Sequence, residues 1–449
     1  MNVSALKAPS ASLSQGLAVF ATEMGAGAIP DSARRVMQLS VLDWIAVATA
    51  GVDEPVSRIV RQMVTEDGGA AQAGVFGLDR KLPTRAAALA NGATSHALDY
   101  DDTHFAFYGH PTVTCVSAAF ALAEKTGASE QSALDAALIG AEAACRIGRW
   151  LGLGHYQHGF HQTATAGTFG AALAASRVLG LDMDQTRHAL GIAATRASGL
   201  KSQFGTMGKP YHAGMAAANG VEAAVLAATG FVSNPDGIDM AQGFAATHAG
   251  DGLVDPLDQL GQAWLFEAVQ HKFHACCHGT HATLEALAEL RDQHGVTPED
   301  VETVTVTVHP MFLKVCNISE PATGLEAKFS LRLTAAMALA GQDTASLASF
   351  TDAICADPRM TALRDRVTVS TDDARPETVA SVEVTLASGG KAQASHDING
   401  QLPLETRERK VRQKASALLG EAYAEACWAR IAAMPDSDRT LTLAGLVRA

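Results

Sequence analysis

Basic residues are scarce in this sequence, and they form no run. Lys and Arg number 34 against 47 Asp and Glu in 449 residues, which gives a formal net charge of −13 at pH 7. Nucleic-acid phosphates and anionic membrane surfaces repel a chain with this acidic balance. We therefore expect neither nucleic acid nor a membrane among its partners, although a few lysines in a pocket could still hold an anionic substrate.

Long apolar runs and a secretory leader are also missing. No uninterrupted apolar run reaches the roughly 18 residues that a membrane-spanning helix needs, and the N-terminal segment lacks the pattern of a signal peptide. The seven cysteines are odd in number and scattered, which is typical of reduced thiols and not of a disulfide framework. These absences together predict a cytoplasmic protein.

Helical spacing of apolar residues dominates the chain from residue 12 to residue 265. Small residues fill the interiors of these segments, which predicts closely packed helices. The expected helices are Ser32–Ala50, Thr84–Leu98, Val113–Lys125, Ser129–Leu151, Thr163–Leu179 and Gly214–Ala228. Helical spacing returns after Pro403. We expect a large all-α domain over residues 1–265 that residues 399–449 complete.

Alternation with period two begins at Val301 and is typical of half-buried strands. The expected strands are Val301–Val308, Arg366–Thr371, Val379–Ala387 and Lys391–Ser395, the last two joined by a Ser-Gly-Gly hairpin turn. Helical spacing at His281–His294 and Ser330–Ala340 separates them. This pattern predicts a smaller α+β domain over residues 266–398, so the fold class is mainly α with an α+β second domain.

An acidic cluster follows the expected helix that ends at Leu98. Three aspartates lie between Asp99 and Asp102, with Thr103 next and His110 after a short loop. Crowded carboxylates raise the affinity of at least one of them for a proton or a cation, and histidine exchanges protons near neutral pH. If the helix continues, Asp99, Asp102 and Thr103 share one face. The cluster is then an active-site wall, a divalent-cation site or a solvated helix end.

His161 lies just ahead of the helix expected to begin at Thr163. The positive end of a helix lowers the pKa of an imidazole and favours its neutral, basic form. The spacing therefore makes His161 a candidate base, with a capping or merely packed histidine as the alternative.

Three glycines surround Lys209 and His212 between Gly205 and Gly214, just before another expected helix. Glycines let the backbone approach a ligand, and a helix N-terminus with cationic side chains suits a carboxylate or phosphate. The alternative is a glycine-rich turn with exposed cations. The spacing is not that of a P-loop, and no strand precedes the glycines as a dinucleotide-binding fold requires.

Four histidines and two cysteines lie between His271 and His281. The residue types suit zinc, but their spacing matches no standard zinc motif, so we expect no metal here. Because ligands often bind where domains meet, we expect these residues to line an active site at the expected domain junction.

Taken in order, the motifs of the chain resemble those of the MmgE/PrpD family. The motifs are Leu42-Asp43-Trp44, His96 to Thr103, His110-Pro111, Phe160-His161, Lys209 to Gly214, Lys272-Phe273, Thr280-His281 and Glu326 to Ser330. The resemblance implies a helical domain, a smaller α+β lid domain with the site between them, and a homodimer. The family includes 2-methylcitrate dehydratase, cis-aconitate decarboxylase and iminodisuccinate epimerase, which use neither metal nor organic cofactor, and we expect none here.

The resemblance also assigns residues to the site. Lys209 and Lys272 would hold substrate carboxylates, and His110 and His161 are candidates for proton transfer. With the motifs above, the candidate catalytic residues are Asp99, His110, His161 and Lys209. The candidate substrate-binding residues are Thr103, His212, Lys272, His274, Cys276 and His278. Asp101 and Asp102 are expected to pair or to shape the turn.

The chemistries of the family share one problem, which is to break or make a bond at a carbon next to a carboxylate. Lysines stabilise the charge that builds on the carboxylate oxygens, and His161 or an aspartate of raised pKa protonates the departing hydroxyl. The chain has Cys277 where the decarboxylase carries a histidine, for which His274 or His278 could substitute, and Cys316 near the place of its tyrosine. Both departures count against decarboxylation.

We therefore expect a cofactor-independent hydro-lyase of the 2-methylcitrate dehydratase type, acting on a small di- or tricarboxylic acid. The alternatives are an epimerase or isomerase, a decarboxylase of a related acid, and a carboxylate-binding protein without catalysis. A metalloenzyme is a further alternative.

Overall fold

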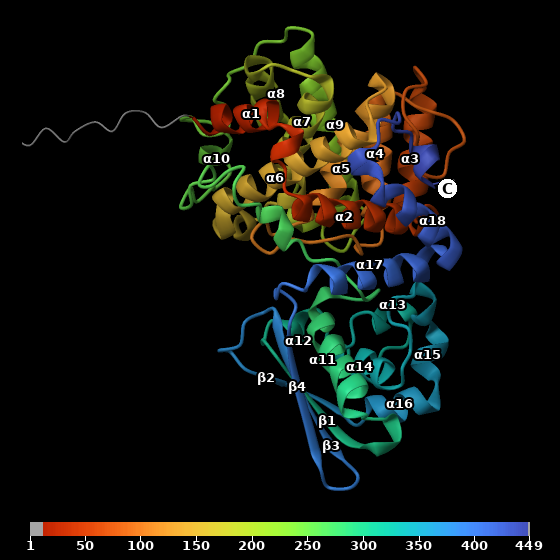
Figure 1. Ribbon diagram of the computed structural model, residues 1–449. Coiled ribbons are helices and arrows are strands. Elements are labelled where there is room, and N and C mark those ends of the chain that lie inside the picture. Colours follow the sequence, from red (N-terminus) through yellow and green to blue (C-terminus); the bar gives the residue numbers. More distant parts are fainter. Residues whose placement is uncertain (1–11, 448–449) are drawn as a thin grey trace, which may run out of the picture. The chain divides into compact units, whose positions relative to one another are not determined.

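The computed structural model describes residues 12–447, and these divide into two compact units (Figure 1). Residues 12–271 and 419–447 form a helical unit, and residues 272–418 form a smaller unit that combines helices with a four-stranded sheet. The predicted fold class, a large helical domain with a smaller α+β domain, is confirmed.

The larger unit is a stack of tightly packed helices. Its long helices are α1 (Leu13–Glu23), α2 (Asp31–Ala50), α3 (Pro55–Asp67), α4 (Thr84–Ser95), α5 (Pro111–Thr126), α6 (Glu130–His158), α7 (Gln162–Leu179), α8 (Met183–Arg196), α9 (Gly208–Ala228) and α18 (Glu421–Ala432). Two short ones, α10 (Phe244–Thr247) and α19 (Leu443–Val447), accompany them. Helices α4, α5, α7 and α9 pack against one another and bury most of their residues.

Glycines permit the contact between α4 and α9. A Cβ atom on Gly214 would lie 2.3 Å from the carbonyl oxygen of Leu89, and one on Gly92 would lie 2.8 Å from the Cα atom of Gly214. Real Cβ atoms do not approach other atoms so closely, so only glycine lets the two backbones touch. This contact fixes the end of α4 against the start of α9, and both ends carry site residues.

Three helix boundaries of the larger unit differ by three residues or more from those predicted. Helix α4 ends at Ser95 instead of Leu98, and α9 begins at Gly208 instead of Gly214. Helix α6 runs past its predicted end, continuing to His158 across a kink at Gly152, where φ is +75°. The first two differences matter for function because they move the acidic cluster out of a helix and bring Lys209 into one.

The sheet of the smaller unit has the strand order β2-β1-β3-β4. Its strands are β1 (Val301–Val308), β2 (Val367–Thr371), β3 (Val379–Leu386) and β4 (Lys391–Asp397), and only the β1–β2 pair is parallel. The four predicted strands and the hairpin are confirmed. Alternate valines of β1 are buried against α11 (His278–His294) and α14 (Leu331–Leu339), which pack with the sheet around one core (Figure 1).

Shorter helices complete the smaller unit: α12 (Phe312–Val315), α13 (Gly324–Ala327), α15 (Asp352–Ala356) and α16 (Pro358–Arg364). Helix α17 (Leu404–Leu419) also belongs to it almost entirely, so the prediction that residues 399–449 all complete the helical domain is wrong. The reason is a charged contact, because Lys410 pairs with Glu285 of α11 and lies 5.1 Å from the centre of the Phe273 ring. The unit begins at Lys272 and not at residue 266.

No single helix within residues 12–447 is long and apolar enough to cross a membrane. Length and composition alone would allow a span only for α2 and α3 taken together, two helices bent by 88°.

Candidate functional site

The segment between α4 and α5, residues 96–110, carries the acidic cluster. Because α4 ends at Ser95, the helix does not continue, and Asp99, Asp102 and Thr103 do not share a helical face. Asp99 has a left-handed backbone (φ +49°) and a side chain that is 52% exposed, whereas Asp102 is buried. Non-glycine residues adopt positive φ rarely and at a cost, and such positions cluster at functional sites.

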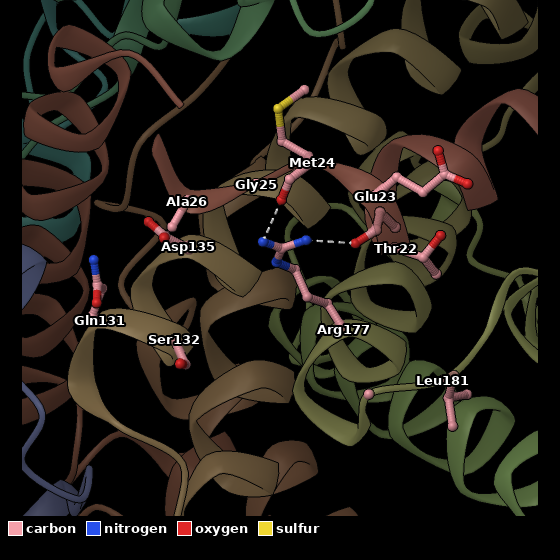
Figure 2. A pocket seen from close by; sticks show the side chains of 12 residues that line it. Thr22, Glu23, Met24, Gly25, Ala26, Gln131, Ser132, Asp135, Arg177 and Leu181 are labelled. Carbon is pink, nitrogen blue, oxygen red and sulfur yellow. Dashed lines mark hydrogen bonds between the residues drawn. The ribbon is translucent and has the colours of Figure 1, made fainter. Parts of the chain in front are cut away.

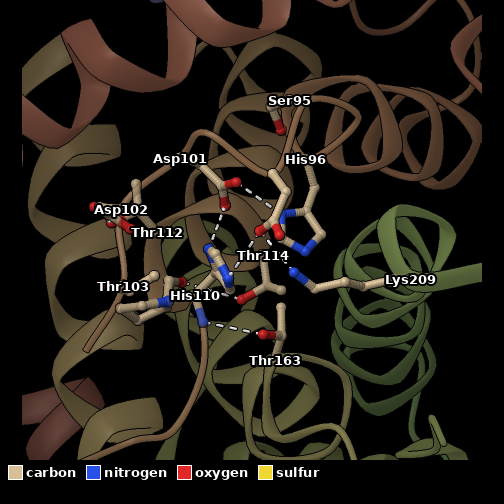
Figure 3. Close-up of polar contacts among 12 residues, drawn as sticks. Ser95, His96, Asp101, Asp102, Thr103, His110, Thr112, Thr114, Thr163 and Lys209 are labelled. Carbon is tan, nitrogen blue, oxygen red and sulfur yellow. Dashed lines mark hydrogen bonds and ion pairs between the residues drawn. The ribbon is translucent and has the colours of Figure 1, made fainter. Parts of the chain in front are cut away.

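Asp101 lies at the centre of the cluster and is buried. Its Oδ1 atom is 2.7 Å from Nδ1 of His96, and its Oδ2 atom is 3.1 Å from Nδ1 of His110 (Figure 3). Burial by itself would raise the pKa of Asp101, but the two imidazoles outweigh it and hold that pKa well below its usual range. Asp101 is therefore an ionised carboxylate held between two histidines.

Lys209 completes the cluster from the first turn of α9. Its Nζ atom is 2.6 Å from Oδ1 of Asp99, the same oxygen that lies 3.4 Å from Nε2 of His110. The lysine side chain is only 16% exposed and enters the cluster from α9, with its Nζ atom 5.4 Å from the centre of the Phe204 ring (Figure 3). Lysine, aspartate and histidine thus share one oxygen atom at the partly exposed edge of the cluster.

His161 is the residue that immediately precedes α7, and it is buried. Its Nδ1 atom is 3.1 Å from Nδ1 of His212, so one ring donates a hydrogen bond and the other accepts it. Burial lowers the pKa of His161 well below its ordinary value, and nearby imidazoles and the Lys209 ammonium lower it further. The predicted neutral His161 is confirmed, with burial as the main cause.

Helix starts set the positions of both candidate proton carriers. His110 and His161 each occupy the position just before a helix, α5 and α7 respectively. The backbone N–H of His110 donates to Oγ1 of Thr163 (3.0 Å) in the first turn of α7 (Figure 3). This hydrogen bond joins the two helix starts, so the two histidines belong to one rigid arrangement.

Asp102 faces the opposite way from Asp101 and makes structural contacts. Ser40 of α2 and Thr112 of α5 both donate to its Oδ2 atom, at 2.7 and 2.6 Å. Burial raises the pKa of Asp102 to about 7 in spite of these hydrogen bonds, and nearby Asp43 adds to the rise. Ser40 also lies 3.1 Å from Nε2 of His271. Asp102 thus connects this segment to α2 and α5, and a role in shaping the turn stays a prediction.

Thr103 is tied down through its backbone. Its N–H donates to the carbonyl of Gln270 at 2.8 Å, and the N–H of Gln270 donates back at 2.6 Å. The pair forms an antiparallel bridge two residues before Lys272. A role for the Thr103 side chain in substrate binding stays a prediction.

Four predicted substrate-binding residues lie in the smaller unit, at or just before the start of α11. Nδ1 of His274 is 2.6 Å from Oγ1 of Thr344, and its Nε2 atom is 3.4 Å from Glu285. Lys272 is buried. Their binding of a substrate stays a prediction.

Cys276 and His278 make local contacts in the same region. The Cys276 thiol is 3.0 Å from Oγ1 of Thr280, and burial raises its pKa to about 12, so it is a neutral thiol. The ring of His278 lies edge-on to that of His281, with centres 4.9 Å apart. A neutral thiol can donate one weak hydrogen bond but contributes no charge to hold a carboxylate.

The central cluster also has the spacing of a metal site. Four side chains have ligand atoms within 4.8 Å of one another: His96, Asp99, Asp101 and His110. However, the Lys209 ammonium already neutralises Asp99, and its positive charge opposes a cation at that place. Both imidazoles moreover engage Asp101. The donor set fits proton exchange better than a resident metal.

Sequence reasoning missed His96, Asp101 and Thr163 as site residues. His96 and Asp101 are five positions apart, a spacing that places them on different sides of a helix. They meet because the chain leaves the helix at Ser95. Both residues lie within a motif noted in the sequence, so the signal was present but was interpreted on a helix that is not there.

A separate cavity of about 420 Å³ lies between the end of α1, α6 and α7 (Figure 2). Arg177 points into it and donates to the carbonyl oxygens of Ala21 and Met24, both at 2.7 Å. Asp135 on its wall pairs with Arg34. Its charged groups thus tie helices together, and none of the candidate site residues is among those that line it.

Comparison with known proteins gives two family matches, the MmgE/PrpD N-terminal domain over residues 15–256 and the MmgE/PrpD C-terminal domain over residues 274–437. The cis-aconitate decarboxylase-like protein oryM of Aspergillus oryzae is 30% identical over 300 residues, 63% of this chain and 62% of the relative. The cis-aconitate decarboxylase of Aspergillus terreus is 31% identical over 292 residues (61% and 59%), and that of Homo sapiens 32% over 284 residues (61% and 59%). The chain spans about three fifths of these relatives' length.

Proposed function

Because the chain belongs to the MmgE/PrpD family, we propose that it is a cofactor-independent lyase acting on a small di- or tricarboxylate. The reaction moves a proton at a carbon next to a carboxylate. The observation that carries the proposal is the chain of contacts Lys209–Asp99–His110–Asp101 beside the neutral His161. It offers a cation, a proton donor and a base within one cluster that is buried except at the edge formed by Asp99.

The cation would bind the substrate. A substrate carboxylate can take the place of Asp99 beside Lys209, because the side chain of Asp99 is the exposed partner of that ion pair. The lysine then stabilises the negative charge that develops on the carboxylate when the adjacent carbon loses a proton. The binding of a second carboxylate by Lys272 is part of the same proposal.

The two histidines would move the protons. Neutral His161 accepts the proton from carbon, and the negative charge of a bound carboxylate raises its basicity for this step. His110 donates a proton to the departing hydroxyl, which leaves as water while the carbon–carbon double bond forms. His161 then gives up its proton and His110 regains one through solvent, so the cycle closes without a cofactor.

Decarboxylation is the second candidate, favoured by the similarity to cis-aconitate decarboxylases. In that reaction a carbon–carbon bond breaks, carbon dioxide leaves, and the electron pair left on carbon takes a proton from a histidine. The same cluster supplies the proton donor and the cation. Dehydration is preferred because it uses both the neutral base and the donor.

The test is turnover of citrate, 2-methylcitrate, cis-aconitate and related acids by the purified chain in EDTA. We expect the substrate to lose water and to release no carbon dioxide. NMR of the product identifies what is formed. Carbon dioxide release establishes the decarboxylase instead, and uptake of solvent deuterium alone establishes an epimerase. No turnover by a protein that melts cooperatively overturns the proposal, as does activity that EDTA abolishes and a metal restores.

A silent carboxylate-binding protein gives a different result. Tricarboxylates would raise its melting temperature without product, and the rise would survive His161→Ala. We also propose a cytoplasmic homodimer, for which light scattering on the eluted protein measures the oligomeric state.

A further inference from the structure

We propose that Asp101 and His96 are positioning residues that fix the tautomer of His110 and aim its Nε2 atom at the reacting group. The inference rests on the proposed function in one respect, since His110 is the proton donor there. It concerns two residues that no motif assigned to the chemistry.

The first step is the hydrogen-bonding capacity of Asp101. A carboxylate accepts hydrogen bonds and cannot donate them. Its two oxygens face Nδ1 of His96 at 2.7 Å and Nδ1 of His110 at 3.1 Å. The His96 contact is a hydrogen bond, and a buried carboxylate oxygen this close to Nδ1 of His110 favours a hydrogen on that atom too. The burial of all three side chains leaves both contacts unscreened by water.

The second step concerns the other nitrogen of His110. With a hydrogen on Nδ1, the neutral ring has its lone pair on Nε2, and the charged ring has its exchangeable proton there. Nε2 lies 3.4 Å from Oδ1 of Asp99, at the exposed edge of the cluster beside Lys209. Proton exchange is thereby confined to the nitrogen that a substrate can reach.

The third step is the role of His96. The centre of the His96 ring lies 4.4 Å from that of His110. Its Nδ1 atom is hydrogen-bonded to Oδ1 of Asp101, the carboxylate oxygen that does not face His110. This contact prevents the carboxylate from rotating toward solvent or binding His110 through the wrong oxygen. His96 follows α4 directly, so the contact fixes the carboxylate to the helical frame.

Other charged groups around His110 do not replace Asp101. Asp99 faces Nε2 and is already paired with a lysine, so it cannot hold Nδ1. The titratable and charged groups that surround the ring, from the 96–110 segment, α9 and the start of α7, are His96, Asp99, Asp101, Lys209 and His161. Asp101 is the carboxylate that faces Nδ1, at 3.1 Å.

The test uses Asp101→Asn, which preserves shape but can present an amide N–H to His110. In protein labelled with ¹⁵N histidine, without substrate, we expect wild-type His110 to carry hydrogen on Nδ1 when neutral. Asp101→Asn should shift it toward the Nε2–H tautomer. With a turned-over acid, kcat should fall roughly 100-fold or more, with KM within about threefold, as for an imidazole in the wrong tautomer.

The matched control is Asp102→Asn, which removes the neighbouring buried carboxylate that contacts Ser40 and Thr112. It should leave the His110 tautomer unchanged and kcat within about threefold. If Asp101→Asn does not fold, His96→Asn retains an N–H donor toward Asp101 and should retain more activity than His96→Ala, with the His110 tautomer preserved.

The proposal is overturned if wild-type His110 carries hydrogen on Nε2, or if Asp101→Asn changes neither tautomer nor kcat. A change in KM alone also overturns it, because that result indicates substrate binding. The NMR measurement needs no substrate. Absence of turnover would therefore contradict the proposed function, whereas the NMR measurement alone tests the tautomer assignment.

Discussion

Lys209 and Asp99 form the contact that balances the charge of the cluster. Lys209 supplies the one cation that contacts the cluster among the described residues, and its ion pair is only partly shielded from solvent. In the free protein Asp99 pairs with the Lys209 ammonium, and a substrate carboxylate can replace Asp99 in that ion pair. Lys209 is therefore paired with a carboxylate both before and after the substrate binds.

Replacement of Lys209 by methionine tests this role. Lys209→Met keeps the length of the side chain and removes its charge, and we expect kcat/KM to fall by about 100-fold or more, as when a charge-stabilising donor is lost. Steady-state kinetics on the best acid substrate measures the effect. Lys391→Met, which breaks an exposed ion pair with Glu383, is the control and should stay within twofold. Equal kinetics for the two variants would contradict the assignment.

The raised pKa of Asp102 predicts a pH-dependent stability effect. Asp102 has a pKa of about 7 in the native state against about 4 when unfolded. The native state thus holds a proton that the unfolded state releases, so this contribution to stability is complete below pH 4 and is lost as pH rises toward 7. One pKa unit corresponds to about 1.4 kcal/mol.

Asp102→Asn removes the stability cost of ionising this buried carboxyl group at high pH. We expect the melting temperature of the variant, relative to wild type, to be higher at pH 8 than at pH 5. Calorimetry at the two pH values measures the difference. If the melting temperature of the variant relative to wild type is the same at pH 5 and pH 8, Asp102 is ionised in the native state at both pH values.

Single residues were predictable where their surroundings follow the chain locally. His161 was predicted to be neutral because its place before a helix is visible in the sequence, although the causes that lower its pKa are burial and the nearby imidazoles and Lys209. Asp101 was not, because its two histidine partners meet only after the chain leaves α4. Its neighbours are set by tertiary contacts that no local pattern encodes.

At the scale of elements, the crossing of α4 and α9 decides where the cluster forms. These helices deliver the 96–110 segment and Lys209 to one place, and they touch through Gly92 and Gly214. Any separation of the two helices would also separate Asp99 from Lys209.

Gly214→Ala tests the crossing. Its Cβ atom would lie 2.3 Å from the carbonyl oxygen of Leu89, so the helices must move apart, and overpacking of this kind costs about 1–3 kcal/mol. We expect a lower urea midpoint and a loss of activity. Gly27→Ala has nothing within 4 Å of the new Cβ and should change stability by less than about 0.5 kcal/mol. A Gly214→Ala midpoint equal to that control would contradict the crossing.

Element types followed the sequence closely, whereas element ends did not. The alternating valines of β1 predicted the strand and its buried face, because a period of two places every second side chain on the same face of a strand and does not match the period of a helix. The membership of α17 depends on a contact with a residue far away in the sequence, Lys410 with Glu285, and the end of α4 at Ser95 is not marked by a Gly or Pro in the sequence. Local patterns cannot carry that information.

At the scale of the whole molecule, buried neutral histidines dominate the response to acid. Burial lowers the pKa of both His104 and His155 to about 4, and lowers that of His161 and His281 well below the ordinary value. Each binds a proton on unfolding between its native pKa and about 6.5, so stability rises with pH across that window. Asp102 opposes this trend, but as one group against several.

We therefore expect the melting temperature to fall as pH is lowered from 6.5 to 4.5. A pH series of scanning calorimetry measures this, and each transition is followed separately because the chain has two compact units. A melting temperature that is flat or rises toward acid would show that these histidines are protonated in the folded protein.

The left-handed backbone at Asp99 limits which side chains evolution or an experimenter can place there. Asparagine tolerates this conformation nearly as well as aspartate, whereas alanine or glutamate adds conformational strain to the loss or displacement of the carboxylate. Most substitutions at this position therefore combine the cost of backbone strain with the cost of losing the carboxylate. Asp99→Asn removes the charge and adds little strain, so its residual activity measures what the charge contributes to turnover.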